Sequence, residues 1–254
     1  MAEGTVGKAL VVLDLVSHQE RPVRFNDLLE ISPYPKATLY RLLQTLTVQG
    51  MLSFDSDNQT YSLGMRLVRL AHNAWRQSSL APIARPYLDE LSKEIKETIH
   101  LAQLDRGNVL YVDKRNAAIP VEMFSQAGKT GPGYCTGVGK AMMAFLAEDI
   151  LDDAIKRQAF AKHTANTILT DADLRAELMS IREAGISYDR EEHEPGIICI
   201  AAPILSASGR PMGAISITTT TAKHALAELD AYKRPLLNTV ENIARDAENW
   251  QFPG

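Results

Sequence analysis

The sequence has few of the features that mark exported, membrane-spanning or disulfide-bonded proteins. It holds only two cysteines, Cys135 and Cys199, and no Cys-x-x-Cys pair. We therefore expect no disulfide framework, no metal site and a reducing compartment. No run of about 18 apolar residues exists that would span a membrane. The first ten residues also lack the regions of a signal peptide. Together these absences predict a cytoplasmic protein with no membrane partner.

The sequence also lacks an excess of positive charge, which would indicate a nucleic-acid-binding protein. The chain has 27 Lys and Arg against 31 Asp and Glu, a formal net charge of −4. Residues 1–76 carry eight basic and seven acidic side chains, so even this region is close to neutral. Contacts to phosphate dominate affinity for DNA. A DNA-binding role therefore requires that the basic groups gather on one face.

The first third of the chain has the pattern of a small helical domain with a hairpin. At 254 residues the chain exceeds a typical single domain, and two domains are expected. Apolar residues at helical spacing predict a helix over residues 5–17. Asn26 is a suitable cap for a short helix over 27–31. After two prolines, a longer helix is expected from Lys36 to Gln49, ending at Gly50. The β-like runs 51–55 and 60–64 then read as a hairpin.

This order of elements is typical of a winged helix-turn-helix, in which the longer helix reads DNA. Four leucines form an apolar stripe on that helix, and the candidate DNA contacts lie off the stripe: Lys36, Thr38, Tyr40, Arg41 and Gln44. Arg41 and Gln44 are suited to base edges, while Lys36 and Thr38 at the helix start suit phosphate. The alternative is a winged-helix module for protein interaction. We favour DNA because these side chains are hydrogen-bond donors rather than an apolar patch.

The remainder of the chain predicts an α+β domain, because strands paired by hairpins alternate with inserted helices. We expect a winged helix-turn-helix at 1–64, a linker helix at 65–78 and a second domain at 79–254. In the second domain a helix follows Ser79. The expected strands are 99–104, 109–113, 121–125, 186–188, 197–205 and 211–218, and the later helices are 140–146, 174–183 and 222–246.

A glycine-rich loop, residues 128–139, is the most conspicuous candidate for ligand binding in this second domain. It fails as a Walker A motif, because Tyr134 stands where the first glycine is required and Ala141 follows the lysine. It also fails as a dinucleotide fingerprint, because Thr136 replaces the third glycine. No cofactor is therefore expected. The loop is either a tight strand-to-helix turn or an anion-binding helix start.

Specific segments resemble one known family. PKATLYRLLQTLTVQGML, followed by YSLGMRLVRLA, resembles the DNA-binding segment of the IclR family of bacterial transcriptional regulators. GYCTGVGKAMMAFL, ISYDREEHEPGIICIAAPI and GRPMGAISI look like the effector domain of that family, which has a GAF-like fold with an antiparallel sheet. The resemblance covers nearly the whole chain. Departures are the extra proline and tyrosine in ISPYPKAT, Val138 in the loop, and Thr218 where a serine is expected.

The resemblance implies a small-molecule effector pocket and assigns residues to it: Gly137, Val138, Asp189, Cys199, Ser216 and Thr218. The effector would be a small organic acid. Because a carboxylate is unfavourable beside Asp189, the alternatives are a hydroxylated ligand or one that is not acidic. The partners implied are double-stranded operator DNA and a second copy of the chain, as a homodimer or a dimer of dimers.

An enzyme is the competing class, since either cysteine could be paired with His100 or His193 as a thiol nucleophile and base. No local motif supports that pairing, so we expect no catalytic residues. The charged run 189–194 offers carboxylates and a histidine, but consecutive loop residues rarely converge on a metal.

Overall fold

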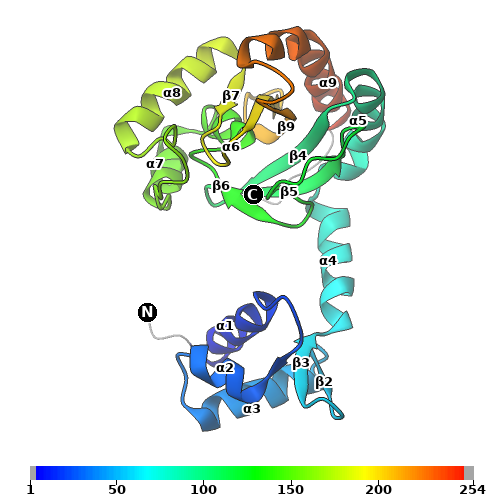
Figure 1. Ribbon diagram of the computed structural model, residues 1–254, viewed down its shortest axis with the longest axis vertical. Coiled ribbons are helices and arrows are strands. Elements are labelled where there is room, and N and C mark those ends of the chain that lie inside the picture. The colour runs from blue at the N-terminus through cyan, green and yellow to red at the C-terminus, as the bar shows by residue number, and fades with distance from the viewer. Residues whose placement is uncertain (1–3, 249–254) are drawn as a thin grey trace. The chain divides into compact units, whose positions relative to one another are not determined.

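The computed structural model describes residues 4–248, apart from the side chains of 76–78. The outermost residues of the two predicted domains, 1–3 and 249–254, lie outside this range. The chain divides into two compact units, Met1–Gln77 and Ser78–Gly254 (Figure 1). No helix within the described residues has both the length and the apolar character needed to cross a membrane.

The first unit contains helices followed by a two-stranded wing. Its elements are α1 (Thr5–Ser17), β1 (Val23–Arg24), α2 (Phe25–Ile31), α3 (Lys36–Val48), β2 (Leu52–Asp55), β3 (Thr60–Leu63) and α4 (Met65–Ser78). Strand β3 lies between β1 and β2 and pairs with both in antiparallel register. This is the helix-turn-helix arrangement that the sequence predicts.

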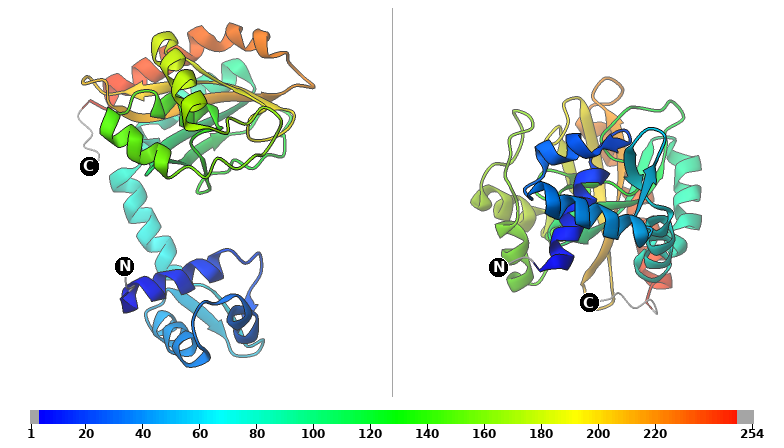
Figure 2. Two further views of the ribbon diagram at one scale, coloured as in Figure 1. Left: turned by 90° about the vertical axis from the view of Figure 1, so that its left-hand side faces the viewer. Right: turned by 90° about the horizontal axis from the view of Figure 1, so that it is seen from below.

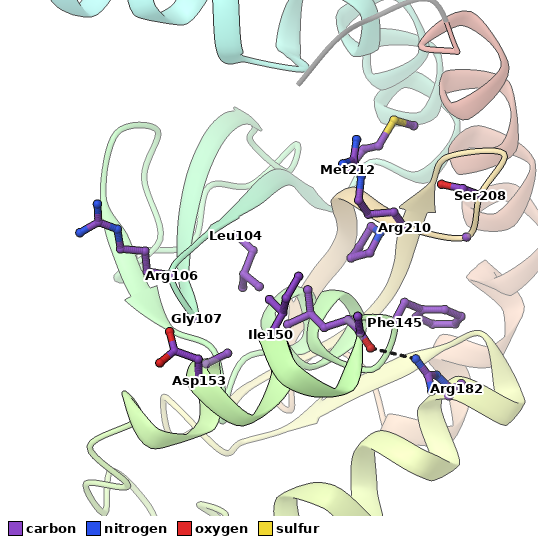
Figure 3. Close-up of a pocket in the computed structure, with 15 residues that line it drawn as sticks. Leu104, Arg106, Gly107, Phe145, Ile150, Asp153, Arg182, Ser208, Arg210 and Met212 are labelled. Atoms are coloured by element: carbon purple, nitrogen blue, oxygen red, sulfur yellow. Dashed lines mark hydrogen bonds between the residues drawn. The ribbon is translucent and has the colours of Figure 1, made fainter. Parts of the chain in front are cut away.

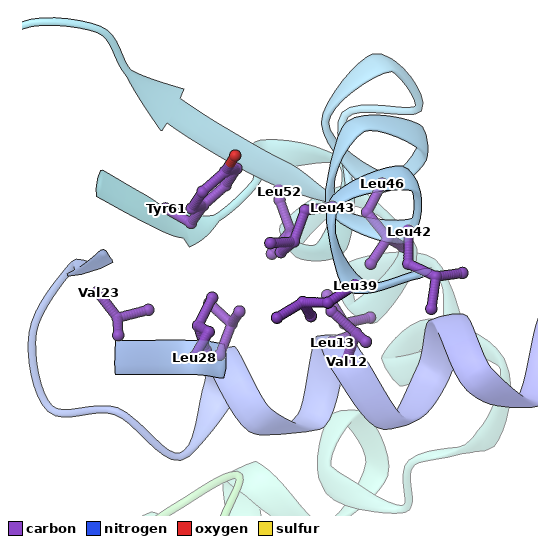
Figure 4. Packing of buried hydrophobic residues seen from close by; sticks show 11 residues of the cluster. Val12, Leu13, Val23, Leu28, Leu39, Leu42, Leu43, Leu46, Leu52 and Tyr61 are labelled. Carbon is purple, nitrogen blue, oxygen red and sulfur yellow. The ribbon is translucent and has the colours of Figure 1, made fainter. Parts of the chain in front are cut away.

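The leucine stripe of α3 forms the core of this unit. Leu39, Leu42, Leu43 and Leu46 are buried, and Figure 4 shows them directed toward α1 and the wing. Val12 and Leu13 of α1 and Leu52 of β2 complete the cluster. Because one side of α3 is committed to this core, its opposite side is left exposed.

Two expectations for this unit are wrong in detail. Asn26 does not cap α2: the helix begins at Phe25, and the carboxylate of Asp27 accepts a hydrogen bond from the Arg24 N–H at 3.3 Å. The sequence also gave no indication of β1, which pairs Val23 with Tyr61 and Arg24 with Thr60. Two residues are too short to produce an alternating pattern.

The second unit is built on one six-stranded antiparallel sheet with the order β6-β5-β4-β9-β8-β7. The strands are β4 (Thr98–Asp105), β5 (Asn108–Arg115), β6 (Thr130–Pro132), β7 (Ser187–Arg190), β8 (Ile197–Leu205) and β9 (Pro211–Thr220). The helices are α5 (Ala81–Ile95), α6 (Gly137–Met143), α7 (Glu148–Lys156), α8 (Asp171–Ala184), the 3-10 helix η1 (Leu226–Tyr232) and α9 (Lys233–Asp246). The predicted α+β class is confirmed.

Helices cover both faces of this sheet. Figures 1 and 2 show α5 and α9 on one side and α6, α7 and α8 on the other. Small residues on the α6 face, Ala102, Ala201 and Ala214, let that helix approach the strands closely. All seven residues of α6 are buried in consequence, including Lys140.

Three further expectations need correction. Residues 121–125 form no strand. Their polar groups are held by side chains instead: Phe124 N–H donates to Glu194 at 3.0 Å, and the Ser125 carbonyl accepts from Lys114 Nζ at 2.9 Å. The expected helix 222–246 is divided into η1 and α9, and α7 was not foreseen. Helix α8 is capped by Thr170, whose hydroxyl accepts a hydrogen bond from Asp173 N–H at 3.1 Å.

Candidate functional site

The five predicted DNA contacts lie on the side of α3 that faces away from the core. Lys36, Tyr40, Arg41 and Gln44 are exposed, and Thr38 is half-buried. The side chains of Lys36 and Arg41 form no ion pair with the described residues of the chain, so their charges remain available. The near-neutral net charge of this unit therefore does not prevent a local basic face.

A groove of about 820 Å³ runs between α3 and the wing. Lys36, Tyr40 and Gln44 line it because they are spaced four residues apart, whereas Thr38 and Arg41 lie outside it. The sequence did not identify its other polar residues, which are Arg24, Asn26 and Gln59. Two of them belong to the region around β1, the strand whose pattern was too short to detect. The Tyr40 ring meets Phe25 edge-on at 6.1 Å, which limits its movement.

In the second unit, the structure brings all six predicted effector residues to one cavity, here called the central cavity. It is enclosed by the start of α6 and by β4, β5, β7, β8 and β9, and its volume is about 30 Å³. Gly137 and Val138 come from α6, Asp189 from β7, Cys199 from β8, and Ser216 and Thr218 from β9. Seven residues that were not assigned to it also line it: His100, Tyr111, Ser125, Thr136, His193, Glu194 and Ile197.

His100 is the centre of the polar network in this cavity. Its Nδ1 lies 3.2 Å from Ser216 Oγ and 3.3 Å from Thr218 Oγ1, and its Nε2 lies 2.8 Å from Ser125 Oγ. Complete burial, together with the nearby Lys114 ammonium, lowers the pKa of His100 to about 3. The imidazole is therefore neutral at physiological pH, and hydroxyl groups satisfy both of its nitrogens.

Asp189 is the second buried titratable group of the central cavity. Burial raises its pKa to about 7, against the hydrogen bond that its carboxylate accepts from Glu192 N–H at 2.8 Å. Near neutral pH a large fraction of this side chain is protonated and able to donate.

The first residue of α6 lies directly against β8. A Cβ atom on Gly137 would stand 2.4 Å from Cys199 Sγ and 3.4 Å from the Cβ of Ala201. Only a glycine fits this close approach. Cys199 therefore lines the cavity as a small side chain pressed between helix and sheet.

This geometry does not support thiol chemistry. Burial raises the pKa of Cys199, and it raises the pKa of Cys135 to about 12, so both remain thiols. The neutral His100 is already engaged by three hydroxyls. No group of three or more metal-ligating side chains that could hold an ion is found within the described residues.

Comparison with known proteins identifies both units. The IclR helix-turn-helix domain matches residues 5–56, and the C-terminal domain of the bacterial transcriptional regulator IclR matches residues 72–245. The HTH-type transcriptional regulator XynR of Escherichia coli K12 is 30% identical over 232 residues, which cover 91% of this chain and 92% of XynR.

Solved structures give the same picture. Thermotoga maritima IclR superposes with a TM-score of 0.75 at 28% identity, covering 96% of this chain and 98% of that one. An IclR homologue from Microbacterium hydrocarbonoxydans, complexed with 4-hydroxybenzoate, shares the fold with a TM-score of 0.79 at 20% identity, covering 96% and 98%. The curated relatives are named transcriptional regulators, so an enzymatic role is not indicated.

The contact between Gly137 and Cys199 leads to a stability prediction. Gly137→Ala should lower the free energy of unfolding by about 1–3 kcal/mol, because the added methyl group overlaps the sulfur. Cys199→Ala removes that sulfur, so the double variant should recover most of the loss. Urea unfolding of all four proteins gives the coupling energy. Equal stability of Gly137→Ala and the wild type would contradict the close packing.

Proposed function

This chain belongs to the IclR family of bacterial transcriptional regulators, and we propose that it binds an inverted-repeat operator through α3 and changes its operator affinity when a hydroxylated organic acid occupies the central cavity. The helix-turn-helix domain implies DNA binding, and C-terminal domains of this family bind small-molecule effectors. The single observation that carries the proposal is the convergence of all six expected effector residues on one cavity.

The operator contacts that we propose are Lys36, Thr38, Tyr40, Arg41 and Gln44. These contacts are supported by the position of the side chains on α3. One side of the helix is occupied by the leucine core, and on the rest of the helix all five side chains except the half-buried Thr38 are exposed. Arg41 and Gln44 present the donors that recognise base edges, and Lys36 lies at the helix start, where a phosphate is favoured. The groove between α3 and the wing adds Arg24 and Gln59 as donors beside this face.

A second copy of the chain is part of the proposal, because dimeric helix-turn-helix proteins place two reading helices in successive major grooves. Exposed apolar side chains within the first unit support such an association. Val6 and Leu10 of α1 and Met65, Val68 and Leu70 of α4 are exposed. Burial of exposed apolar side chains against a partner is favourable. The resulting assembly is a dimer or a dimer of dimers.

The chemistry of the central cavity supports an effector that carries hydroxyl groups and a carboxylate. His100, Ser216 and Thr218 are neutral groups that exchange hydrogen bonds readily with hydroxyls. An ionised Asp189 would repel a carboxylate, but the proton retained on Asp189 turns it into a donor. The helix start at Gly137 adds backbone N–H groups to this site.

The size of the cavity implies that binding requires movement. About 30 Å³ corresponds to one water molecule, far below the volume of an organic acid. The effector must therefore favour a conformation in which residues around the cavity separate. A ligand that binds one conformation better shifts the population toward that conformation. Effector binding would change operator affinity through this shift.

Arg41→Ala tests the proposed DNA contact. We expect it to weaken operator binding by about 1–3 kcal/mol while leaving the fold intact, because the side chain is exposed and forms no ion pair within residues 4–248. The measurement is a gel-shift titration on an operator selected from a random duplex library by the wild-type chain.

Arg157→Ala is the matched control for this titration, since it removes one exposed arginine from the second unit. It should leave operator affinity unchanged. Undiminished binding by Arg41→Ala would remove this residue from the interface. If the wild-type chain bound no DNA duplex but bound another protein, that result would favour the protein-interaction alternative.

The effector proposal predicts a pH dependence that Asp189→Asn should abolish. The folded-state pKa of Asp189 lies above that of the unfolded chain, so the protonated form is favoured in the fold and is lost as the pH rises through about 7. A carboxylate ligand that needs this proton should lose affinity by about tenfold for each pH unit above the pKa. The asparagine keeps the acceptor for Glu192 N–H but does not titrate.

Calorimetry against a panel of hydroxylated aliphatic and aromatic acids, between pH 6 and 9, provides the measurement. At least one member should bind the wild type with this pH profile and bind Asp189→Asn with a flat one. A panel in which no acid binds, or binding whose pH profile is the same in both proteins, would contradict the proposed role of Asp189.

A further inference from the structure

The second unit contains another pocket, here called the distal pocket, which is distinct from the central cavity. Its volume is about 680 Å³, and it is formed where the β4–β5 turn, the β8–β9 turn, the residues after α6, helix α7 and the end of α8 meet. Figure 3 shows its lining side chains. No residue is shared between the two linings.

The floor of the distal pocket is apolar and has the size of a small-molecule site. Leu104, Phe145 and Ile150 lie together at its centre in Figure 3, and Met212 closes one side. Binding sites for small organic molecules occupy about 300–1,000 Å³ and are lined mainly by apolar groups. The distal pocket meets both conditions, whereas the central cavity has a volume of only about 30 Å³.

Arginines from three separate segments are among the residues that line the distal pocket. Arg106 lies in the β4–β5 turn, Arg182 near the end of α8, and Arg210 in the β8–β9 turn (Figure 3). All three are exposed, and none forms an ion pair with any residue in the described part of the chain. Arg182 donates to the Leu146 carbonyl at 3.1 Å, and its guanidinium lies 6.0 Å from the centre of the Phe145 ring.

One carboxylate lines the distal pocket, and it is already neutralised. Asp153 accepts from Arg157 Nε at 2.9 Å, an i,i+4 pair on α7. By contrast, the guanidinium groups of Arg106 and Arg210 form no ion pair with any residue among 4–248. Guanidinium groups bind carboxylates, sulfonates and phosphates through charge-assisted hydrogen bonds.

We propose that the distal pocket is a second small-molecule site, which binds an organic anion with an apolar, ring-containing body. The body lies on Leu104, Phe145 and Ile150, and the anionic group lies at the arginine rim. This site does not depend on the proposed function of the central cavity, since the two linings differ.

The distal pocket is nevertheless connected to the central cavity through two shared strands and through the segment that follows α6. Helix α6 begins at Gly137 in the central cavity and ends beside Phe145 in the distal pocket. Strand β4 carries His100 in the central cavity and Leu104 in the distal pocket. Strand β9 carries Ser216 in the central cavity and Met212 in the distal pocket. A ligand in the distal pocket would thus contact two of the strands that position the effector residues.

The test uses a fluorescent anion of this class, 8-anilinonaphthalene-1-sulfonate, and its uncharged counterpart N-phenyl-1-naphthylamine, titrated into the full chain. The double variant R106Q/R210Q should bind the sulfonate about tenfold more weakly and bind the uncharged compound as the wild type does. The control K93Q/R245Q makes the same change in net charge at exposed residues of α5 and α9. It should bind both probes as the wild type does.

A second pair of variants tests the floor without removing an arginine. Ile150 is 54% exposed, so both Ile150→Glu and Ile150→Lys should fold. The glutamate should weaken sulfonate binding, while the lysine should not. Sulfonate affinity that is unchanged in R106Q/R210Q, or reduced equally in K93Q/R245Q, would overturn the proposal. A change of oligomeric state in both Ile150 variants, with unaltered sulfonate binding, would also overturn the proposal. That result would indicate that this face is an interface between copies of the chain.

Discussion

The close contact between α6 and the sheet determines how the rest of the second unit is built. The helix begins with a glycine because a Cβ would meet Cys199 Sγ at 2.4 Å, and small residues on the strands allow this approach along the helix. A helix placed so deeply has no exposed face. Lys140 is therefore fully buried, and its ammonium requires partners, which are Glu192 at 2.5 Å and Glu177 at 3.1 Å.

That buried ion pair in turn shapes the central cavity. Glu192 is held in place by Lys140, and the backbone N–H of Glu192 donates to Asp189 at 2.8 Å. The carboxyl group of Asp189 is thereby fixed at the wall of the cavity, opposite the network around His100. One continuous set of contacts therefore links three features. These are the packing of Gly137 against Cys199, the ion pair of Lys140 with Glu192, and the carboxyl group of Asp189. A ligand that separates these residues must disturb all of them, which is how a small molecule could alter the whole unit.

The sequence was sufficient for the class of fold and for the helices with strong periodicity, such as α1, α3 and α8. The six residues that line one cavity were assigned to an effector site by the family resemblance and not by any local pattern. His100 was considered only as a possible base for a thiol. Its place in the central cavity depends on the pairing of β4 with β9, which sets it opposite Ser216. Ser125 was misread as part of a strand. The distal pocket is formed by segments that are far apart in the chain, so no local sequence pattern predicts it.

The central claim is that occupancy of the central cavity and affinity for the operator are coupled. The most direct test is a reciprocal measurement on the full chain. Operator affinity is determined with and without a saturating hydroxy acid that binds the cavity, and affinity for that acid is determined with and without saturating operator. The account predicts that both affinities change by the same factor, on the order of 5–150-fold. An acid that binds the central cavity and leaves operator affinity unchanged would contradict it.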